Sequence, residues 1–432
     1  MKNNSTKNSK YIFSALNLCI LFVLITAAYV GAQNPTPAIQ TSDTPFSWAS
    51  TPPADCPFLQ SENFKSIEFT GKYRNYTNAD TWYPSWAEDD ALYSPWTDGY
   101  ILDPQHYETF NYEHPGFACN SLDYMGRKAA TAQARIIGDN PLDLTIENIP
   151  PRIEGSPLPY GGRYPCGSLI YNGVWYYGTY CLTNNPKNSC NGVGWTEFGP
   201  FVGFRYSIDY GKHWSECPHT PENPLFAENP LDAKIRIGAP HFVDFGRNMK
   251  HSPDGCAYLI AHGSTDREAC NNWIQADNVY LIRVKPSIAT INDSSAYQFY
   301  AGQKGLGPIW SDNFADIKPL VSWPGHLGCV TMSYNAPLKK YLMCITRGKS
   351  SQTGDTMILE SKELSGPWAI VHYLSNFGPF AYFVNIPTKF ISKGGYSFWL
   401  SYSANFSRKN RPGNPPGSHY SLSLHEVRLI QK

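Results

Sequence analysis

Short apolar and aromatic runs, separated by turn residues, recur along most of the chain, and this pattern is typical of β-strands. In five stretches an apolar strand leads to a Gly or Asp turn and an aromatic strand follows: residues 85–97, 167–180, 239–262, 330–346 and 388–402. These hairpins lie about 50 to 80 residues apart, which predicts an all-β fold, a five-bladed β-propeller. A pair of β-sandwiches is the alternative that the pattern leaves open.

The end of the chain indicates how such a ring is closed. Residues 418–430 alternate apolar and polar positions. We expect this strand to pair with an early one, such as residues 67–73, because closure removes the exposed edges of a sheet protein. Helical patterns are nearly absent, and the one modest candidate covers residues 121–137.

The N-terminus predicts export. Three lysines precede an apolar run over residues 14–30, which ends in a small-residue cleavage pattern. We therefore expect residues 1–32 to be a signal peptide and the mature protein to be secreted, with an uncleaved membrane anchor as the alternative. Residues 33–60, rich in Pro, Thr and Ser, are expected to form an extended leader, and residues 61–432 a single propeller domain.

Composition narrows the class of function. Aromatic residues make up 15% of the chain and charged residues only 16%. Without the signal peptide the chain carries three more acidic than basic residues, which excludes a nucleic-acid footprint. Aromatic side chains fill sheet cores and also stack on the C–H faces of sugars, so a carbohydrate partner is expected. We also expect the protein to be a monomer.

Cysteine usage predicts a disulfide-stapled fold. Cys19 lies in the signal peptide, and the even number left in an exported chain implies disulfides. Their expected pairing is Cys166–Cys181, Cys329–Cys344, Cys256–Cys270, Cys190–Cys217 and Cys56–Cys119. Asn75, Asn292 and Asn405 begin glycosylation sequons. No ligand spacing demands a metal, so no cofactor is required, and a structural Ca²⁺ or Zn²⁺ at the propeller centre stays open.

One turn has a sharp signature. The run from Ser207 to Trp214 fits S-x-D-x-G-x-x-W, the Asp-box pattern of sialidases and other propellers. The aspartate accepts N–H groups of the turn, Gly permits positive φ, and Trp packs inward. Asp209 is therefore expected to be structural.

The richest candidate for catalysis is the stretch from residue 78 to 99. Asp80 precedes a predicted strand and Asp98 ends the next, so both carboxylates are expected on one rim of the sheet. Trp82, Trp86 and Trp96 accompany them. Two carboxylates flanked by aromatic platforms are what glycoside hydrolysis needs, although carboxylates also serve turns.

A second cluster lies around His241. Arg236 and His241 begin a strand that could reach a cleft, with Asp244 close by, and His241 could act as acid, base, hydrogen-bond donor or metal ligand. Tyr160 and Arg163 form a similar cluster, in which Arg163 could clamp a carboxylate. A structural role for His241 is the competing interpretation.

Several short motifs together resemble a known family. They are the Asp80 and Asp98 segments, the Asp box, residues 241–246, 279–284, 333–341 and 364–368. The chain resembles propeller proteins grouped around domain-of-unknown-function family 4185, which are distantly similar to the five-bladed enzymes of glycoside hydrolase family 43. The resemblance implies cleavage of glycosidic bonds by acids on one face of the propeller. Of the three acids of family 43, the resemblance places only the first, at Asp80, and Ala239-Pro240-His241 stands where those enzymes tend to show Asp-Pro.

Three functions follow. The first is a glycoside hydrolase that uses Asp80 and Asp98. The second is a polysaccharide lyase on uronic-acid polymers, in which a base removes the proton beside a carboxylate that Arg neutralises; His241, Tyr160, Arg163 and Arg236 would serve it. The third is a non-catalytic glycan-binding propeller.

Overall fold

The structure is a computed structural model of the chain. It describes residues 40–41, 44–100, 128–183, 197–228, 234–266, 271–305, 307–350, 353–404 and 413–432. These residues belong to one compact unit, Ile39–Lys432.

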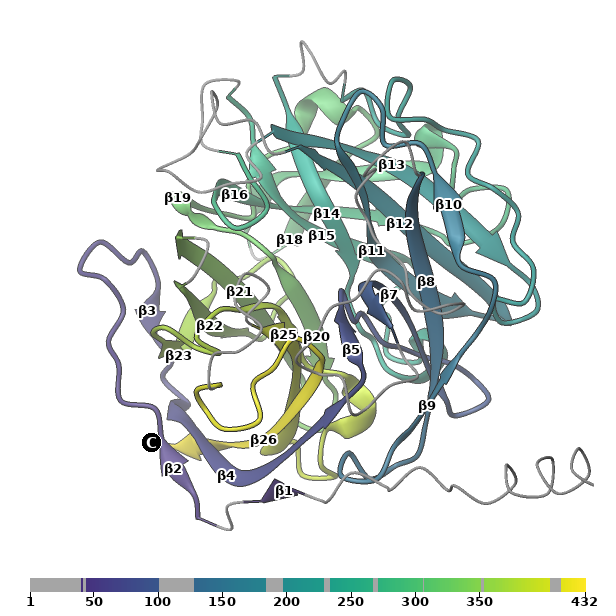
Figure 1. Ribbon diagram of the computed structural model, residues 1–432. Coiled ribbons are helices and arrows are strands. Elements are labelled where there is room, and N and C mark those ends of the chain that lie inside the picture. The colour runs from purple at the N-terminus through teal and green to yellow at the C-terminus, as the bar shows by residue number, and fades with distance from the viewer. Residues whose placement is uncertain are drawn as a thin grey trace, which may run out of the picture. The chain divides into compact units, whose positions relative to one another are not determined.

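Five antiparallel sheets form the blades of a β-propeller, as predicted (Figure 1). Blade 1 contains β5 (Asn78–Asp80), β6 (Ser85–Trp86), β7 (Leu92–Tyr100), β8 (Ala129–Ile137), β9 (Thr145–Asn148) and β10 (Ile153–Gly155). Blade 2 contains β11 (Gly162–Tyr171), β12 (Val174–Thr183) and β13 (Glu197–Ser207). Blade 3 contains β14 (Arg236–Phe242), β15 (Ala257–Ser264), β16 (Ala276–Val284), β17 (Tyr297–Lys304), β18 (Gly307–Ser311) and β19 (Val321–Leu327).

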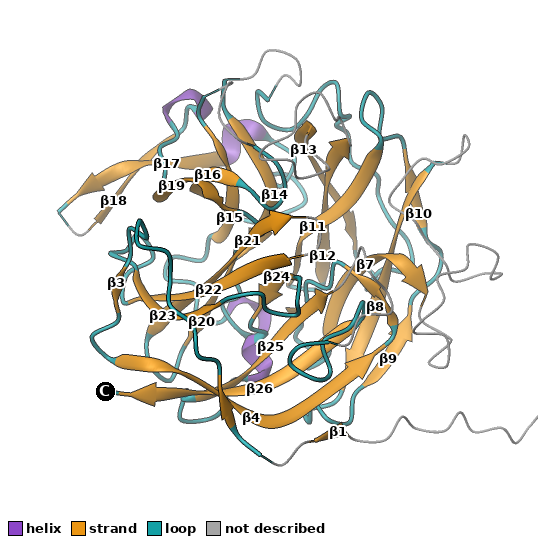
Figure 2. Ribbon diagram, turned by 60° about the vertical axis from the view of Figure 1, so that its left-hand side comes forward, coloured by secondary structure: helices purple, strands orange, loops and turns teal. Residues whose placement is uncertain are grey.

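The last two blades also take strands from the start of the chain. Blade 4 contains β20 (Thr331–Asn335), β21 (Lys340–Ser350), β22 (Thr353–Ser361), β23 (Ala369–Leu374) and β3 (Leu59–Gln60). Blade 5 contains β24 (Ala381–Asn385), β25 (Ser397–Ala404), β26 (Leu422–Gln431), β4 (Phe64–Tyr76), β1 (Gln40–Thr41) and β2 (Phe46–Ser47). Short 3₁₀ helices are η2 (Arg247–Met249), η3 (Ser294–Ala296), η4 (Phe314–Asp316) and η5 (Thr388–Phe390). Figure 2 shows how little helix the fold contains.

The ring closes as the sequence predicted. β26 pairs with β4, so that Leu429 faces Ile67 and Val427 faces Phe69, and the two strands run side by side in both views (Figures 1 and 2). The first long strand of the chain is thereby the outer neighbour of the last one. This pairing covers an edge of β26 that would otherwise be open.

The expected leader takes part in the blades. β1 and β2 pair with β4, and β3 pairs in parallel with β23. Phe46 stacks on Phe69 with ring centroids 4.9 Å apart. Residues 44–60 are thus an ordered outer layer of blades 4 and 5.

Two local expectations have opposite outcomes. The helical candidate at 121–137 is wrong where it is described, because residues 129–137 form β8, whose side chains are almost all buried between strands and blades. The turn after β13 forms as expected: Asp209 accepts hydrogen bonds from Ser207 Oγ at 2.8 Å and from the backbone N–H of His213 at 2.9 Å. Trp214 packs against Trp175, with ring centroids 5.2 Å apart. Asp209 therefore has a structural contact set.

The cysteine pairing fails because of strand register. The Asn172-Gly173 turn forms, with φ of 50° and 76°. Its register, shifted by a bulge, places Cys181 opposite Arg163 rather than Cys166, and both cysteines are free. The predicted Cys166–Cys181 disulfide is wrong.

The Cys329–Cys344 disulfide is also wrong. Cys344 lies opposite Thr331, whereas Cys329 precedes β20 and its Sγ donates to the carbonyl of Trp273 at 3.1 Å. Both thiols are free. Of the other cysteines, Cys56, Cys217 and Cys256 are free, and Cys119, Cys190 and Cys270 lie outside the described residues.

The sequons are not open surface sites in the folded chain. The amide nitrogen of Asn292, which glycosylation would modify, donates to the carbonyl of Phe204 at 2.7 Å. That of Asn75 donates to Ser423 Oγ at 3.0 Å. A glycan on either nitrogen would replace one of its two N–H groups, and Asn405 lies outside the described residues.

Candidate functional site

The structure brings Asp80 and Asp98 together where the inner strand of blade 1 begins. Asn78 pairs with Tyr100 and Asp80 with Thr97, so β7 carries one extra residue between these pairs. This β-bulge holds Asp98 in a left-handed conformation with φ of 53°. Bulges commonly redirect a side chain beside a functional site, and non-glycine residues occupy this region at a cost in strain.

The electrostatics of the pair separate its two members. Burial raises the pKa of Asp80 well above its ordinary value, and the negative charge of Asp98 raises it further. Asp80 is only 7% exposed, whereas Asp98 is half-buried, so solvent reaches the pair from the side of Asp98. Of two carboxyl groups in such unequal environments, the more buried one is the one on which protonation is favoured.

Two tyrosines that sequence reasoning missed lie beside Asp80. The hydroxyl of Tyr382 donates to Asp80 Oδ2 at 2.9 Å, and Tyr420 opposes the rise in the pKa of this carboxyl group. Asp80 Oδ1 is buried and has no hydrogen-bond partner among the described residues. Tyr382 comes from β24 and Tyr420 from the segment before β26, so only the closed ring brings them to blade 1.

Further aromatic rings surround the pair. Trp273 packs edge-on against Tyr382 with ring centroids 5.4 Å apart. Tyr164 packs on Tyr180 with ring centroids 5.6 Å apart, and it contributes to the raised pKa of Tyr420, of which burial is the main cause. Tyr164 is half-buried, and Trp273 is 7% exposed. The candidate site, defined here as Asp80, Asp98, Tyr382, Tyr420 and these two rings, is thus a carboxyl pair in an aromatic setting.

The three tryptophans predicted as sugar platforms are in the wrong place. Trp82 and Trp96 are 2% and 0% exposed and stack on each other, with ring centroids 6.4 Å apart. Trp86 is half-buried, and its Nε1 donates to Asp90 at the distant hairpin of blade 1. Side chains of a blade alternate between its two faces, and a neighbouring blade covers each face, so these rings became core.

His241 lies deeper in the channel, away from the carboxyl pair. Its ring packs on Tyr83 at 4.1 Å and on Phe383 at 4.9 Å. Burial, with a smaller effect from His262, lowers the pKa of His241 to about 3. In the described parts of the chain His241 makes no contact with Asp80, and its catalytic role stays a prediction.

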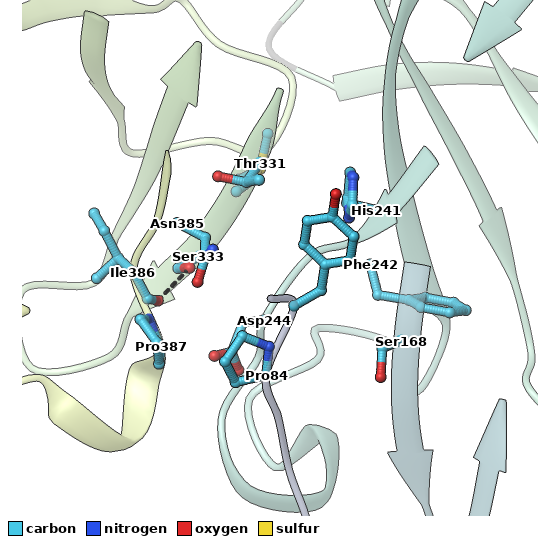
Figure 3. A pocket seen from close by; sticks show the side chains of 12 residues that line it. Pro84, Ser168, His241, Phe242, Asp244, Thr331, Ser333, Asn385, Ile386 and Pro387 are labelled. Carbon is cyan, nitrogen blue, oxygen red and sulfur yellow. Dashed lines mark hydrogen bonds between the residues drawn. The ribbon is translucent and has the colours of Figure 1, made fainter. Parts of the chain in front are cut away.

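A small cavity of about 40 Å³ lies at the end where the inner strands finish. His241, Asp244, Thr331, Ser333 and Asn385 are among the residues that line it (Figure 3). Ser333 Oγ donates to the carbonyl of Ile386 at 2.6 Å. This volume holds no more than one or two water molecules, and no sugar ring fits it.

The remaining candidates do not gather at the carboxyl pair. Arg163 is buried in blade 2, where its Nε donates to Thr179 Oγ1 at 3.0 Å. Tyr160 is buried against Cys181 and Val202. Arg236 is half-buried and lies close to the buried carboxyl group of Glu228. These contacts are internal to blade 2 and its junction with blade 3.

Within the described ranges, no group of three or more His, Cys, Asp or Glu side chains could hold a metal ion. The same residues include no helix long and apolar enough to cross a membrane.

The protein is an all-β, five-bladed propeller with an aspartate pair where its first inner strand begins. No family model matches the sequence, and no curated protein matches it. Solved structures share part of its shape at low identity. One is a Bacteroides ovatus protein with a proposed hydrolase function, at 11% identity and a TM-score of 0.48, with 87% of this chain and 92% of that chain covered.

Two further solved structures are similar at the same level. A family 117 glycoside hydrolase from Zobellia galactanivorans has 12% identity and a TM-score of 0.43, covering 85% of this chain and 91% of its own. An α-L-arabinofuranosidase from Clostridium thermocellum has 13% identity and a TM-score of 0.42, covering 82% and 94%. At this distance, function has to be argued from the geometry of the site.

Proposed function

We propose that the protein hydrolyses glycosidic bonds, with Asp80 as general acid and Asp98 as general base or nucleophile. The observation that carries this proposal is the unequal carboxyl pair: a buried Asp80 whose pKa is raised, beside a half-buried Asp98. Glycoside hydrolysis needs one protonated and one ionised carboxyl group on either side of the scissile bond.

The tyrosines support these roles. Tyr382 donates to Asp80 Oδ2 and so fixes the orientation of the carboxyl group. As general acid, Asp80 would give its proton to the leaving-group oxygen. Water or the sugar itself approaches from the side of Asp98, which is the more exposed member.

The residues expected for a polysaccharide lyase are divided between two blades. Tyr160 and Arg163 are buried in blade 2, whereas His241 is buried and Arg236 half-buried in β14 of blade 3. Elimination needs a base and a cation within reach of one sugar unit. A lyase would be recognised by the ultraviolet absorbance of its unsaturated products.

The test is a screen of the purified chain against plant, algal and bacterial polysaccharides, with release of reducing ends as readout. Asp80→Asn and Asp98→Asn should each abolish hydrolysis of any polymer that the wild type cleaves. Asp209→Asn is the matched control, because this aspartate binds only its own turn. Unchanged rates in the first two variants would remove the assignment, and glycan binding without turnover would favour the non-catalytic alternative.

Export completes the proposal. A secreted enzyme would meet polysaccharide outside the cell, act without a cofactor and work as a monomer. N-terminal sequencing of the exported protein should begin at Gln33, and retention of residues 1–32 would contradict the predicted cleavage.

A further inference from the structure

A groove at the rim of blade 3 has no part in the site described above. It has a volume of about 630 Å³, and its lining includes Lys234, Ile235, Thr265, Phe314, Ile317 and Lys318. This volume is in the range of small-molecule and sugar sites. Its walls combine apolar side chains with amine and hydroxyl groups at the edge.

The groove lies on the same face of the propeller as the carboxyl pair. Inner strands of a propeller run in the same direction, so their starts share one face. Asp80 is at the start of the inner strand of blade 1, and Ile235 directly precedes β14, the inner strand of blade 3. Thr265 follows β15, which runs back toward that face. A ligand that crosses the face could therefore touch both places.

Phe314 gives the groove a rigid aromatic wall. It stacks on the buried ring of Phe226 with centroids 5.6 Å apart and planes 12° apart, and the ring of Phe299 supports it edge-on at 5.2 Å. Phe314 itself is half-buried in η4, whose N-cap Asn313 accepts a hydrogen bond from Ala315. A ring held in this way loses little entropy when a sugar stacks on it.

The edge of the groove is positively charged. Lys234 and Lys318 are both exposed, and neither ammonium group forms an ion pair with another residue in the described parts of the chain. Asp316, two residues before Lys318, accepts a hydrogen bond from Ser311 Oγ at 2.7 Å. An anionic group placed in the groove would meet the amines of Lys234 and Lys318.

We propose that this groove binds an anionic sugar unit of a polysaccharide, with Phe314 as the stacking platform and Lys234 and Lys318 as the groups that bind its carboxylate or sulfate. The site recognises charge and a sugar face together. It concerns binding and holds whether or not the carboxyl pair performs hydrolysis.

The test measures binding by affinity electrophoresis and calorimetry, using polygalacturonate as the uronate probe, dextran sulfate as the sulfated probe and dextran as the uncharged probe. The double variant Lys234→Gln/Lys318→Gln should weaken binding of an anionic probe about tenfold, as expected for two exposed charge contacts. Phe314→Ala should weaken it as well. The preferred anionic probe shows whether carboxylate or sulfate is the natural group.

Matched controls separate this site from general electrostatics and from the proposed catalysis. Lys362→Gln/Lys393→Gln removes the same net charge from two other exposed lysines and should leave binding unchanged. Asp80→Asn should also keep binding, whatever it does to hydrolysis. The proposal is overturned if neither anionic probe binds, if the control pair weakens binding equally, or if dextran binds as well as the charged polymers. The two lysine pairs are exposed, so loss of folding does not obscure the result.

Discussion

An aspartate lies near each end of the central channel, Asp244 half-buried and Asp80 buried, and the two have different hydrogen-bond partners. Near the end where the inner strands finish, Asp244 accepts hydrogen bonds from the backbone N–H and Oγ1 of Thr388, at 2.8 and 2.7 Å, and from the N–H of Gly246 at 2.9 Å. At the other end, Asp80 accepts a hydrogen bond from the Tyr382 hydroxyl and has a second carboxyl group beside it.

This difference distinguishes a carboxylate with a structural role from one that can take part in proton transfer. Burial raises the pKa of Asp244, but three hydrogen bonds oppose this effect. At Asp80 burial and Asp98 act in the same direction, and they outweigh the donors. A carboxylate bound by backbone donors is held in place as an anion, whereas one next to a like charge is poised to exchange a proton.

The largest expected effect is on activity. Asp80→Asn or Asp98→Asn should lower kcat/KM about 10²- to 10⁴-fold on a cleaved substrate, which is the usual contribution of a general acid or base. Asp244→Asn should keep the wild-type kcat, because this side chain does not reach the carboxyl pair. Equal losses from substitutions at both ends would erase the functional distinction between them.

The next effect is on how stability depends on pH. The pKa of Asp80 is raised by folding above its unfolded value of about 3.9, so the folded state keeps a proton that the unfolded chain releases. The associated stability is fully present below about pH 4 and is lost as pH rises toward the folded-state pKa. Asp80→Asn should therefore gain stability relative to the wild type, by up to about 1.4 kcal/mol per pH unit in this window.

Urea unfolding of both proteins from pH 4 to pH 8 measures this gain. Asp209→Asn is the control: burial would raise the pKa of Asp209, but hydrogen bonds from His213 and Ser207 lower it to about 2, so it titrates below this window. Parallel pH profiles for wild type and Asp80→Asn would show that Asp80 is ionised in the folded protein.

A smaller effect is expected at the structural end. Asp244→Asn should destabilise the fold by about 1–3 kcal/mol. The NH₂ group of Asn would replace one carboxylate oxygen, and the N–H group that donates to this oxygen in the wild type would lose its acceptor. Thr388→Ala removes one of the same hydrogen bonds and should cost less, about 1 kcal/mol. The urea midpoint reports both. Unchanged midpoints would mean that the hydrogen bonds between Asp244 and Thr388 do not stabilise the contact between the end of β14 and η5.

The fold could be read from the sequence because its rules are local. Alternating strands and Gly or Asp turns located the inner hairpins of blades 1 to 4, whereas the range 388–402 expected in blade 5 begins in η5, after β24. The alternation at 418–430 identified the closing strand. The carboxyl pair was found for the same reason, since β5 and β7 form one hairpin. The bulge that turns Asp98 inward has no comparable sequence signal.

The features that the sequence did not predict depend on contacts between distant blades or on the strand register within a hairpin. Tyr382 and Tyr420 reach Asp80 only after more than three hundred residues have closed the ring. Trp82 and Trp96 are of a residue type that stacks on sugars, but the adjacent blade covers their indole rings. A shift of register along β11 and β12 was enough to separate Cys166 from Cys181.

The smallest expected effect tests the donors that distinguish the two ends. The Tyr382 hydroxyl stabilises the ionised form of Asp80, so Tyr382→Phe should raise the pKa of this carboxyl group. If Asp80 is the general acid, the basic limb of kcat/KM against pH should move upward by up to about one pH unit, the equivalent of one hydrogen bond. Tyr373→Phe is the matched control, because Tyr373 donates to Asp355 within blade 4. A basic limb that stays in place in Tyr382→Phe, or that moves equally in both variants, would show that Tyr382 does not tune this acid.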